Sequence, residues 1–399
     1  MPPLAEWACR SSGICKNTTI RCAFVATSAI SFGVQMSELW GGLLKGYSYD
    51  INFCYRVFPW VLKTEKKTRD SASVKVVIIG FSSNCSSNHA IYEVASSGGE
   101  NDKKYSVQGI NCYLVEGDDI IIEPQEEPLS AICRIKKGIV RSDGNWLMIG
   151  EKQISEFDKK YLREIINGSS LYSGKKRYCL WLKDYDLEGL KEIPEINIRL
   201  IQCSLFRGCS GKSIAKYQDV PHLFASDWEE EGDYYAYANV TTKVNPLPVV
   251  RVGGSVVPET GVSTIKELCS SAYCIMSSNL YSVWIDRLAM EMGGGGKQVY
   301  TTQIYNTFIF LEPHDEAQKE TFTRLQKELL SIYDNAESID KLYKSNDKHW
   351  RFVLDEINDN VYKLYGFIHE DGKRYTDDEV FAGLLKLYQK RVEELNNKH

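Results

Sequence analysis

The alternation of apolar and polar residues near the start of the chain predicts three strands and one helix. These elements are expected at residues 22–30, 35–44, 49–60 and 74–81. The first run is short, apolar and uncharged, which is typical of a buried strand. The second has apolar residues at helical spacing and is followed by Gly46, a common helix end. The third alternates in polarity and the fourth is almost wholly apolar, so this segment is expected to form a β-α-β-β unit.

Further along, short apolar runs alternate with turn residues, which predicts an α+β arrangement. The runs lie at residues 110–117, 120–123, 147–149, 178–182, 196–201, 234–237 and 249–252. One helix is expected at residues 155–166, with Ser155 as its N-cap and Gly168 at its end. Residues 82–104 are rich in Ser, Asn and Gly, which predicts a linker or a surface loop.

Helical periodicity dominates the last part of the chain. Residues 280–290 are amphipathic, and after Pro313 the pattern stays helical to the end. One apolar stripe ends at Gly366, and the segment from Thr376 to Glu379 is a capping box that opens the last helix. The stripes mark core or interface positions and carry no catalytic pattern.

The composition is that of an ordinary globular protein, with 43% hydrophobic and 25% charged residues among 399, enough for two or three domains. No apolar run reaches the ~18 residues of a membrane span, so no membrane partner is expected. The net charge of −5 excludes a uniformly basic nucleic-acid binder, and DNA binding would need a local patch. The twelve cysteines lack Cys-x-x-Cys spacing, which favours free thiols in a reducing cytoplasm and no metal site.

Several segments resemble the MmeI-like (type IIG/IIL-like) adenine-specific DNA methyltransferases of bacteria. In the first part of the chain they are Phe24–Ile30, Tyr55–Trp60 and Val76–Phe81. In the middle they are Ile110–Val115, Asp143–Leu147, Lys176–Leu182 and Gln298–Phe310. The resemblance runs from about Ile14 to Glu394 and is interrupted between Lys212 and Pro258.

The resemblance implies a fold class and a division of the chain. Residues 1–95 are expected to form the C-terminal third of a class I (Rossmann-like) methyltransferase sheet. Residues 105–311 are expected to form a mixed α+β target-recognition domain, and residues 312–399 an all-α tail. The implied location is the cytoplasm of a bacterium, in association with the nucleoid.

The resemblance also implies the site residues. Phe58 and Trp60 occupy the place of the aromatic residue that stacks on a flipped adenine, although both rings could instead be core. The candidate contacts to double-stranded DNA are seven basic residues: Arg134, Lys136, Lys137, Arg141, Lys175, Lys176 and Arg177. A solvated face is the alternative for this charge run, and the acidic segment 227–233 is expected to face away from DNA.

The motifs for methyl transfer itself are missing from these residues. The family uses S-adenosylmethionine, held by a glycine-rich turn, and an Asn-Pro-Pro-Tyr/Phe motif for the target amine. The glycines at 253–254 and 293–296 do not lie between a strand and a helix N-terminus. We therefore expect a truncated methyltransferase of a restriction-modification or phage-defence system. The alternatives are a DNA-recognition module that acts with a separate catalytic chain, and an inactive gene fragment, which the atypical leader 1–13 favours.

The missing donor-binding turn generates a first prediction. The 399-residue chain by itself is expected not to bind S-adenosylmethionine, because it has no cradle for the donor. Isothermal titration calorimetry checks this, and stoichiometric binding in the micromolar range would contradict it.

Overall fold

The computed structural model describes most of the chain. The described residues are 18–31, 36, 40, 49–60, 74–83, 88–94, 102–229, 232–243, 245–290, 297–298 and 302–397. The leader 1–13 and the glycines 293–296 lie outside them. Of the predicted helix 35–44 the structure describes only Met36 and Trp40, which are both helical and buried.

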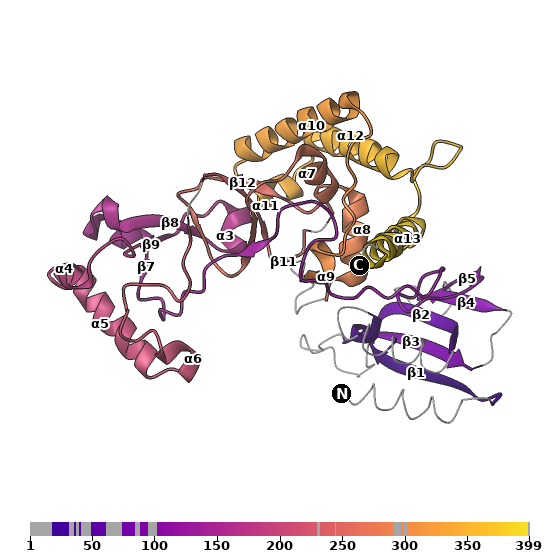
Figure 1. Cartoon of the computed structure of the whole chain (residues 1–399), viewed down its shortest axis with the longest axis horizontal. Coiled ribbons are helices and arrows are strands. Elements are labelled where there is room, and N and C mark those ends of the chain that lie inside the picture. The colour runs from indigo at the N-terminus through magenta and orange to yellow at the C-terminus, as the bar shows by residue number, and fades with distance from the viewer. Residues whose placement is uncertain are drawn as a thin grey trace, which may run out of the picture.

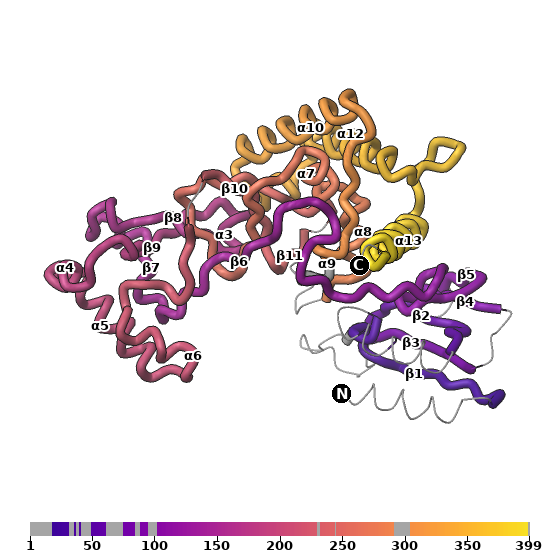
Figure 2. The backbone as a smooth tube through the Cα atoms, viewed as in Figure 1, coloured from indigo at the N-terminus to yellow at the C-terminus, as the bar shows by residue number. Residues whose placement is uncertain are grey.

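The molecule is elongated, as Figure 1 shows, with a five-stranded sheet at one end and a small lobe around α5 at the other. The helices α10, α12 and α13 lie along the body between them. The backbone tube of Figure 2 shows the C-terminus beside α13, close to the five-stranded sheet. The last helix of the chain therefore lies close to the sheet that the first strands form. None of the helices in the part that the structure describes is long and apolar enough to cross a bilayer.

The five-stranded sheet contains all three strands predicted near the start of the chain. Its strands are β1 (Arg21–Thr27), β2 (Asp50–Trp60), β3 (Val74–Ser82), β4 (His89–Glu93) and β5 (Lys103–Val107). The order is β1-β3-β2-β4-β5, and every pairing is antiparallel except β2–β4. The predicted loop at residues 82–104 is wrong in part, because β4 and β5 extend the sheet there. Ile91, which is 2% exposed, anchors β4 to the core.

The prediction that residues 22–30 form a buried strand is also wrong in part. The strand exists as β1, and residues 28–31 continue as a 3-10 turn. Among the strands that the structure describes, β1 lies at the edge of the sheet and pairs only with β3. The side chain of Val25 is 52% exposed, and only Ala26 of this strand is buried. The apolar run therefore faces solvent on one side.

The middle of the chain forms two four-stranded sheets. One has the order β12-β10-β14-β6 and consists of β12 (Val250–Val252), β10 (Tyr234–Ala238), β14 (Val262–Ile265) and β6 (Lys136–Lys137). The other has the order β13-β8-β9-β7 and consists of β13 (Val257–Pro258), β8 (Leu162–Ile166), β9 (Tyr178–Leu180) and β7 (Met148–Ile149). A short pair joins β11 (Val240–Thr241) to β15 (Lys297–Gln298). The strands predicted at 234–237 and 249–252 are confirmed as β10 and β12.

Helices cover these sheets. They are α3 (Gly168–Ser173), α4 (Leu187–Lys191), α5 (Pro194–Gly208), α6 (Lys212–Ala215), α7 (Ser270–Met276), α8 (Asn279–Leu288) and α9 (Thr302–Tyr305). The 3-10 turns η2 (Glu151–Glu156) and η3 (Lys159–Tyr161) precede β8. The helix predicted at 280–290 is confirmed as α8.

One prediction in this region is wrong. The helix expected at 155–166 is two 3-10 turns followed by β8, because Leu162 and Glu164 pair with β9 and Ile165 is fully buried in the sheet. The apolar run at 196–201 forms part of α5. Its buried residues Ile196 and Leu200 lie one helical turn apart, while Ile198 and Ile201 are more than half exposed.

The helical tail agrees with its prediction. It consists of α10 (Glu316–Asn335), α11 (Ile339–Lys344), α12 (Lys348–Tyr365) and α13 (Asp377–Asn396). Gly366 ends α12 with φ of +70°, and Thr376 and Glu379 form the capping box of α13. One cluster of buried apolar residues extends from Ile51 and Cys54 in the sheet to Phe381 and Leu385 in α13. The sheet and the tail therefore share a core.

The close approach of Gly138 to the backbone of Glu259 provides the second prediction. Gly138 follows β6, and a Cβ there would lie 2.1 Å from the backbone oxygen of Glu259, which cannot move without shifting β13. Gly138→Ala is expected to lower the free energy of unfolding by about 1–3 kcal/mol, measured in urea. Gly109→Ala is the control, because a Cβ at Gly109 meets nothing within 4 Å. Equal stability of the two variants would contradict the prediction.

Candidate nucleic-acid interface

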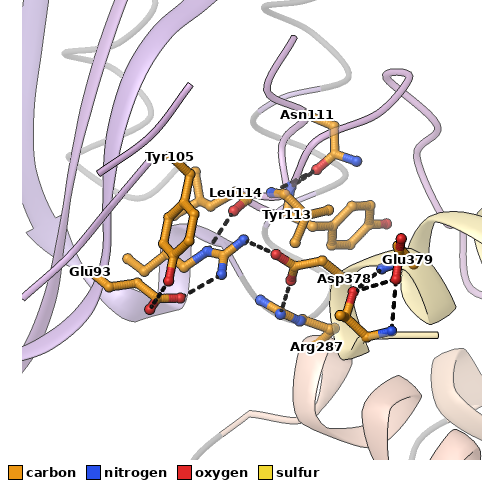
Figure 3. A network of polar contacts seen from close by, with 11 residues as sticks. Glu93, Tyr105, Asn111, Tyr113, Leu114, Arg287, Asp378 and Glu379 are labelled. Atoms are coloured by element: carbon orange, nitrogen blue, oxygen red, sulfur yellow. Dashed lines mark hydrogen bonds and ion pairs between the residues drawn. The ribbon is translucent and has the colours of Figure 1, made fainter. Parts of the chain in front are cut away.

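Arg56 is the centre of a polar junction between the five-stranded sheet and the rest of the molecule. Its Nε donates a hydrogen bond to the carbonyl oxygen of Leu114 at 3.1 Å. Its Nη1 bonds Glu93 Oε1 at 2.8 Å, and its Nη2 bonds Asp378 Oδ2 at 2.5 Å. Figure 3 shows Glu93, Leu114 and Asp378 gathered around this position. One side chain of β2 thus binds β4, the turn after β5, and α13.

A second arginine completes the junction. Arg287 of α8 bonds the other oxygen of Asp378 at 2.5 Å, and the Tyr105 hydroxyl donates to Glu93 at 3.1 Å. The turn that offers the Leu114 carbonyl is unusual, because Leu114 has φ of +61°. The Asn111 side chain stabilises it by accepting hydrogen bonds from the backbone N–H groups of Tyr113 and Val115.

The charges of the junction hold one another in place. Burial opposes the charge on Arg56, but its hydrogen bonds to Asp378 and Glu93 outweigh burial and raise its pKa. Burial lowers the pKa of Arg287, which Asp378 partly compensates. Burial also raises the pKa of the neighbouring Cys54 to about 12, so this thiol stays protonated and is not a nucleophile. The cysteines of the described residues are free thiols.

Phe58 and Trp60, the candidates for base stacking, lie at the far end of β2. Trp60 is 47% exposed and Phe58 is half-buried, with their ring centroids 6.5 Å apart. Their partners on β3 are Val76 and Val74. Trp60 is therefore not a core residue, and the pair presents aromatic surface at the end of the strand.

Two of the candidate DNA-binding arginines are engaged by an acidic residue of the protein. Arg177 Nη1 lies 2.5 Å from one oxygen of Glu259, and Arg141 Nε lies 3.5 Å from the other. Arg141 also contacts Asp143 and Asn145. The Glu259 side chain is only 13% exposed, so the two arginines neutralise a largely buried carboxylate.

Three other candidates lie near the sheet β12-β10-β14-β6. Arg134 is exposed and paired with Glu127. Lys136 and Lys137 form β6 and line a hollow of about 270 Å³ together with Asp227 and Asp233 of the acidic segment. The structure therefore brings the acidic segment to these two lysines, which weakens their local positive potential.

Lys175 and Lys176 are exposed and line an open groove of about 730 Å³ between η2 and α3, and Arg177, which binds Glu259, lines the same groove. The groove also contains Lys152, Ser169 and Ser173, which sequence reasoning missed. Ser169 and Ser173 lie on α3 just before the basic run, whereas Lys152 of η2 is 23 positions from Lys175 and reaches the groove only through the tertiary structure. Asn167 caps α3, which forms one side of the groove. Its side-chain oxygen accepts a hydrogen bond from the backbone N–H of Ser170, and its own backbone N–H donates to the Ser170 hydroxyl. The groove also contains Glu151.

The glycine pair that the sequence offers as a cofactor turn lies between two strands. Gly253 and Gly254 connect β12 to β13 and therefore do not precede a helix N-terminus. In the described part of the chain, no group of three His, Cys, Asp or Glu side chains could hold a metal ion. The chemistry that this part offers is hydrogen bonding, positive charge and aromatic surface.

Two family models match segments of this chain. A family model described as MmeI, DNA-methyltransferase domain, matches residues 4–93, and one described as MmeI, target recognition domain, matches residues 116–312. DNA methyltransferase A of Bacillus subtilis (strain 168) is 24% identical over 411 residues, which cover 98% of this chain and 44% of that protein.

A solved structure of the type IIL restriction-modification enzyme MmeI in complex with DNA has the same fold. It superposes with a TM-score of 0.84 at 25% sequence identity, over 98% of this chain and 52% of that chain. The chain thus spans about half the length of the relatives that it matches.

The junction around Arg56 generates the third prediction. Arg56→Met leaves Glu93 without this partner and Asp378 with one arginine instead of two, so the free energy of unfolding is expected to fall by about 1–3 kcal/mol. Urea denaturation measures this. Lys191→Met is the control, because it removes an exposed pair with Glu188, and its effect is expected to stay below about 0.5 kcal/mol.

A double-mutant cycle sharpens this test. Combining Arg56→Met with Asp378→Asn is expected to cost less than the sum of the two single changes, because both remove the same contact. Strict additivity would show that the contact does not stabilise the junction.

Proposed function

Since the chain belongs to the MmeI-like DNA methyltransferases with a target-recognition domain, we propose that it recognises a specific site in double-stranded DNA for methylation of adenine N6. Methyl transfer would use S-adenosylmethionine, bound by residues other than those described here. The groove at Lys175 and Lys176 carries the proposal, because it joins lysines and hydroxyl groups within the segment that matches a recognition domain.

The basic residues divide into two roles in this proposal. Lys152, Lys175 and Lys176 contact phosphates from the groove, with Ser169 and Ser173 as hydrogen-bond donors. Arg141 and Arg177 hold Glu259, and they act as positioning residues for the strands around it. This assignment replaces the direct phosphate contacts expected for these two arginines from the sequence.

The proposal gives Phe58 and Trp60 the role of stacking on the extruded adenine. Chemistry on a base inside a duplex requires the base to leave the stack, and an aromatic ring compensates for the lost stacking. Exposure of Trp60 at the end of β2 supports this role, because a ring that receives a base must be accessible.

We further propose the division of the chain into a methyltransferase part (1–95), a recognition domain (105–311) and a helical tail (312–399). The edge position of β1 supports further strands beside it, since an apolar edge strand is an association site. Those strands would come from the remainder of a longer protein or from a separate chain.

Binding to duplex DNA at several salt concentrations tests the proposal. The salt dependence of the affinity counts the phosphates that are neutralised, and each true contact contributes roughly 0.9 to the slope. Lys175→Ala is therefore expected to lower the slope by about one unit and the affinity several-fold at low salt. Fluorescence anisotropy with a labelled duplex measures both quantities.

A matched control distinguishes local contacts from overall charge. Lys327→Ala removes the same charge from the exposed surface of α10, and it should leave the slope unchanged. If the two variants behave alike, or if the parent chain does not bind duplex DNA, the groove is not the recognition site.

A further inference from the structure

The outer face of β2 carries a row of aromatic rings. Paired residues of a sheet share a face, and Phe53, Tyr55, Phe58 and Trp60 pair with the alternate β3 residues 80, 78, 76 and 74. A register shift between Tyr55 and Phe58 makes this possible. Without the extra residue, Phe58 and Trp60 would face the opposite side from Phe53 and Tyr55.

Residues of the strands β3, β4 and β5 lie against this aromatic row. Phe53 lies over Gly80, since a Cβ at that glycine would come within 2.1 Å of the ring. Tyr92 of β4 pairs with Tyr55, and the two rings stack at 4.6 Å with an interplanar angle of 12°. The ammonium group of Lys104, on β5, lies 5.7 Å from the centroid of Tyr92.

The same face is hollowed into a basin of about 510 Å³. Its polar lining consists of Arg21, Asn52, Tyr55, Asn88, His89, Tyr92, Lys104 and Ser106. No Asp or Glu is among the described residues that line it, whereas Glu151 lines the groove at Lys175. His89 is bound through Nε2 to the carboxylate of Asp50 at 2.9 Å, so the cations of the basin that complement an anion are Arg21 and Lys104, with amides and hydroxyl groups beside them.

The opposite face of the same strands has a different character. Glu93 of β4 points there, where it binds Arg56, and its partner on β5 is Lys103. The sheet therefore separates an inner face of paired charges from an outer face of cations and aromatic rings.

We propose that this outer face binds single-stranded DNA, with backbone phosphates in the basin that Arg21 and Lys104 line from the two edge strands, and unpaired bases along the aromatic row. Base faces are available for stacking only outside a duplex, and a positive groove beside aromatic rings is the usual surface for such strands. The inference goes beyond the proposed duplex recognition and rests on it only for the shared rings Phe58 and Trp60. The basin is separate from the groove at Lys175.

A pair of adjacent lysines tests the proposal with the full chain. The probes are a labelled oligothymidine of about 20 nucleotides and a labelled duplex, followed by fluorescence anisotropy at low salt. Lys104→Glu is expected to weaken single-strand binding about tenfold, because it places a negative charge in the basin. Lys103→Glu makes the same charge change one residue earlier, on the other face of β5. It is expected to change the affinity for the single strand less than about twofold.

The aromatic row is tested by Trp60→Leu. This exposed ring can be removed without a cavity, and its loss is expected to weaken single-strand binding about fivefold or more while the melting temperature stays unchanged. Duplex binding that depends on Lys175 should persist in Lys104→Glu.

The outcomes separate the two proposals. Equal effects of Lys103→Glu and Lys104→Glu, or no binding of the oligothymidine by the parent chain, would overturn the single-strand site while duplex recognition stands. If the parent chain binds the oligothymidine but not the duplex, the proposed function is overturned and the proposed single-strand site stands. Binding of a free nucleotide as tightly as the oligothymidine would show a nucleotide pocket instead of a strand site.

Discussion

The contact between Arg56 and Asp378 is the constraint on which the arrangement of the molecule depends. These residues are 322 positions apart, yet their side chains meet at 2.5 Å, and the same guanidinium binds Glu93 and the carbonyl oxygen of Leu114. Because the guanidinium donors are fixed in one plane, four segments must adopt one mutual geometry to satisfy them. The proposed stacking residues begin two positions after Arg56, so the junction also sets where they lie relative to α13.

The two faces of β2 carry different side chains. The inner face holds Cys54 in the core and Arg56 in the junction, and the outer face holds the aromatic row. The irregularity between Tyr55 and Phe58 is what aligns the rings, since a regular strand would place half of them inside. A local departure from regular pairing therefore creates a surface that composition alone does not suggest.

Charge in the recognition region divides in a similar way. Arg141 and Arg177 converge on the largely buried Glu259, which also lies against Gly138. Leaving such a carboxylate unpaired would be costly, which explains why two arginines converge on it. Lys175 and Lys176 remain exposed at the groove, where Lys152 joins them. Arg177 therefore pairs with a largely buried carboxylate, whereas its sequence neighbours Lys175 and Lys176 are exposed.

Elements with local signals could be predicted from the amino-acid sequence alone. The strands β2 and β3, the helix α8, the capping box at Thr376 and the end of α12 at Gly366 follow from periodicity and from backbone preferences within a few residues, and the resemblance correctly indicated the family. The tertiary contacts determine that Leu162–Ile166 is a strand, because pairing with β9 overrides its helical pattern. They also determine which arginines are engaged by Glu259 and which strand edge is exposed. These outcomes depend on contacts between distant segments, and the free energy of such contacts is not encoded in any local window of the chain.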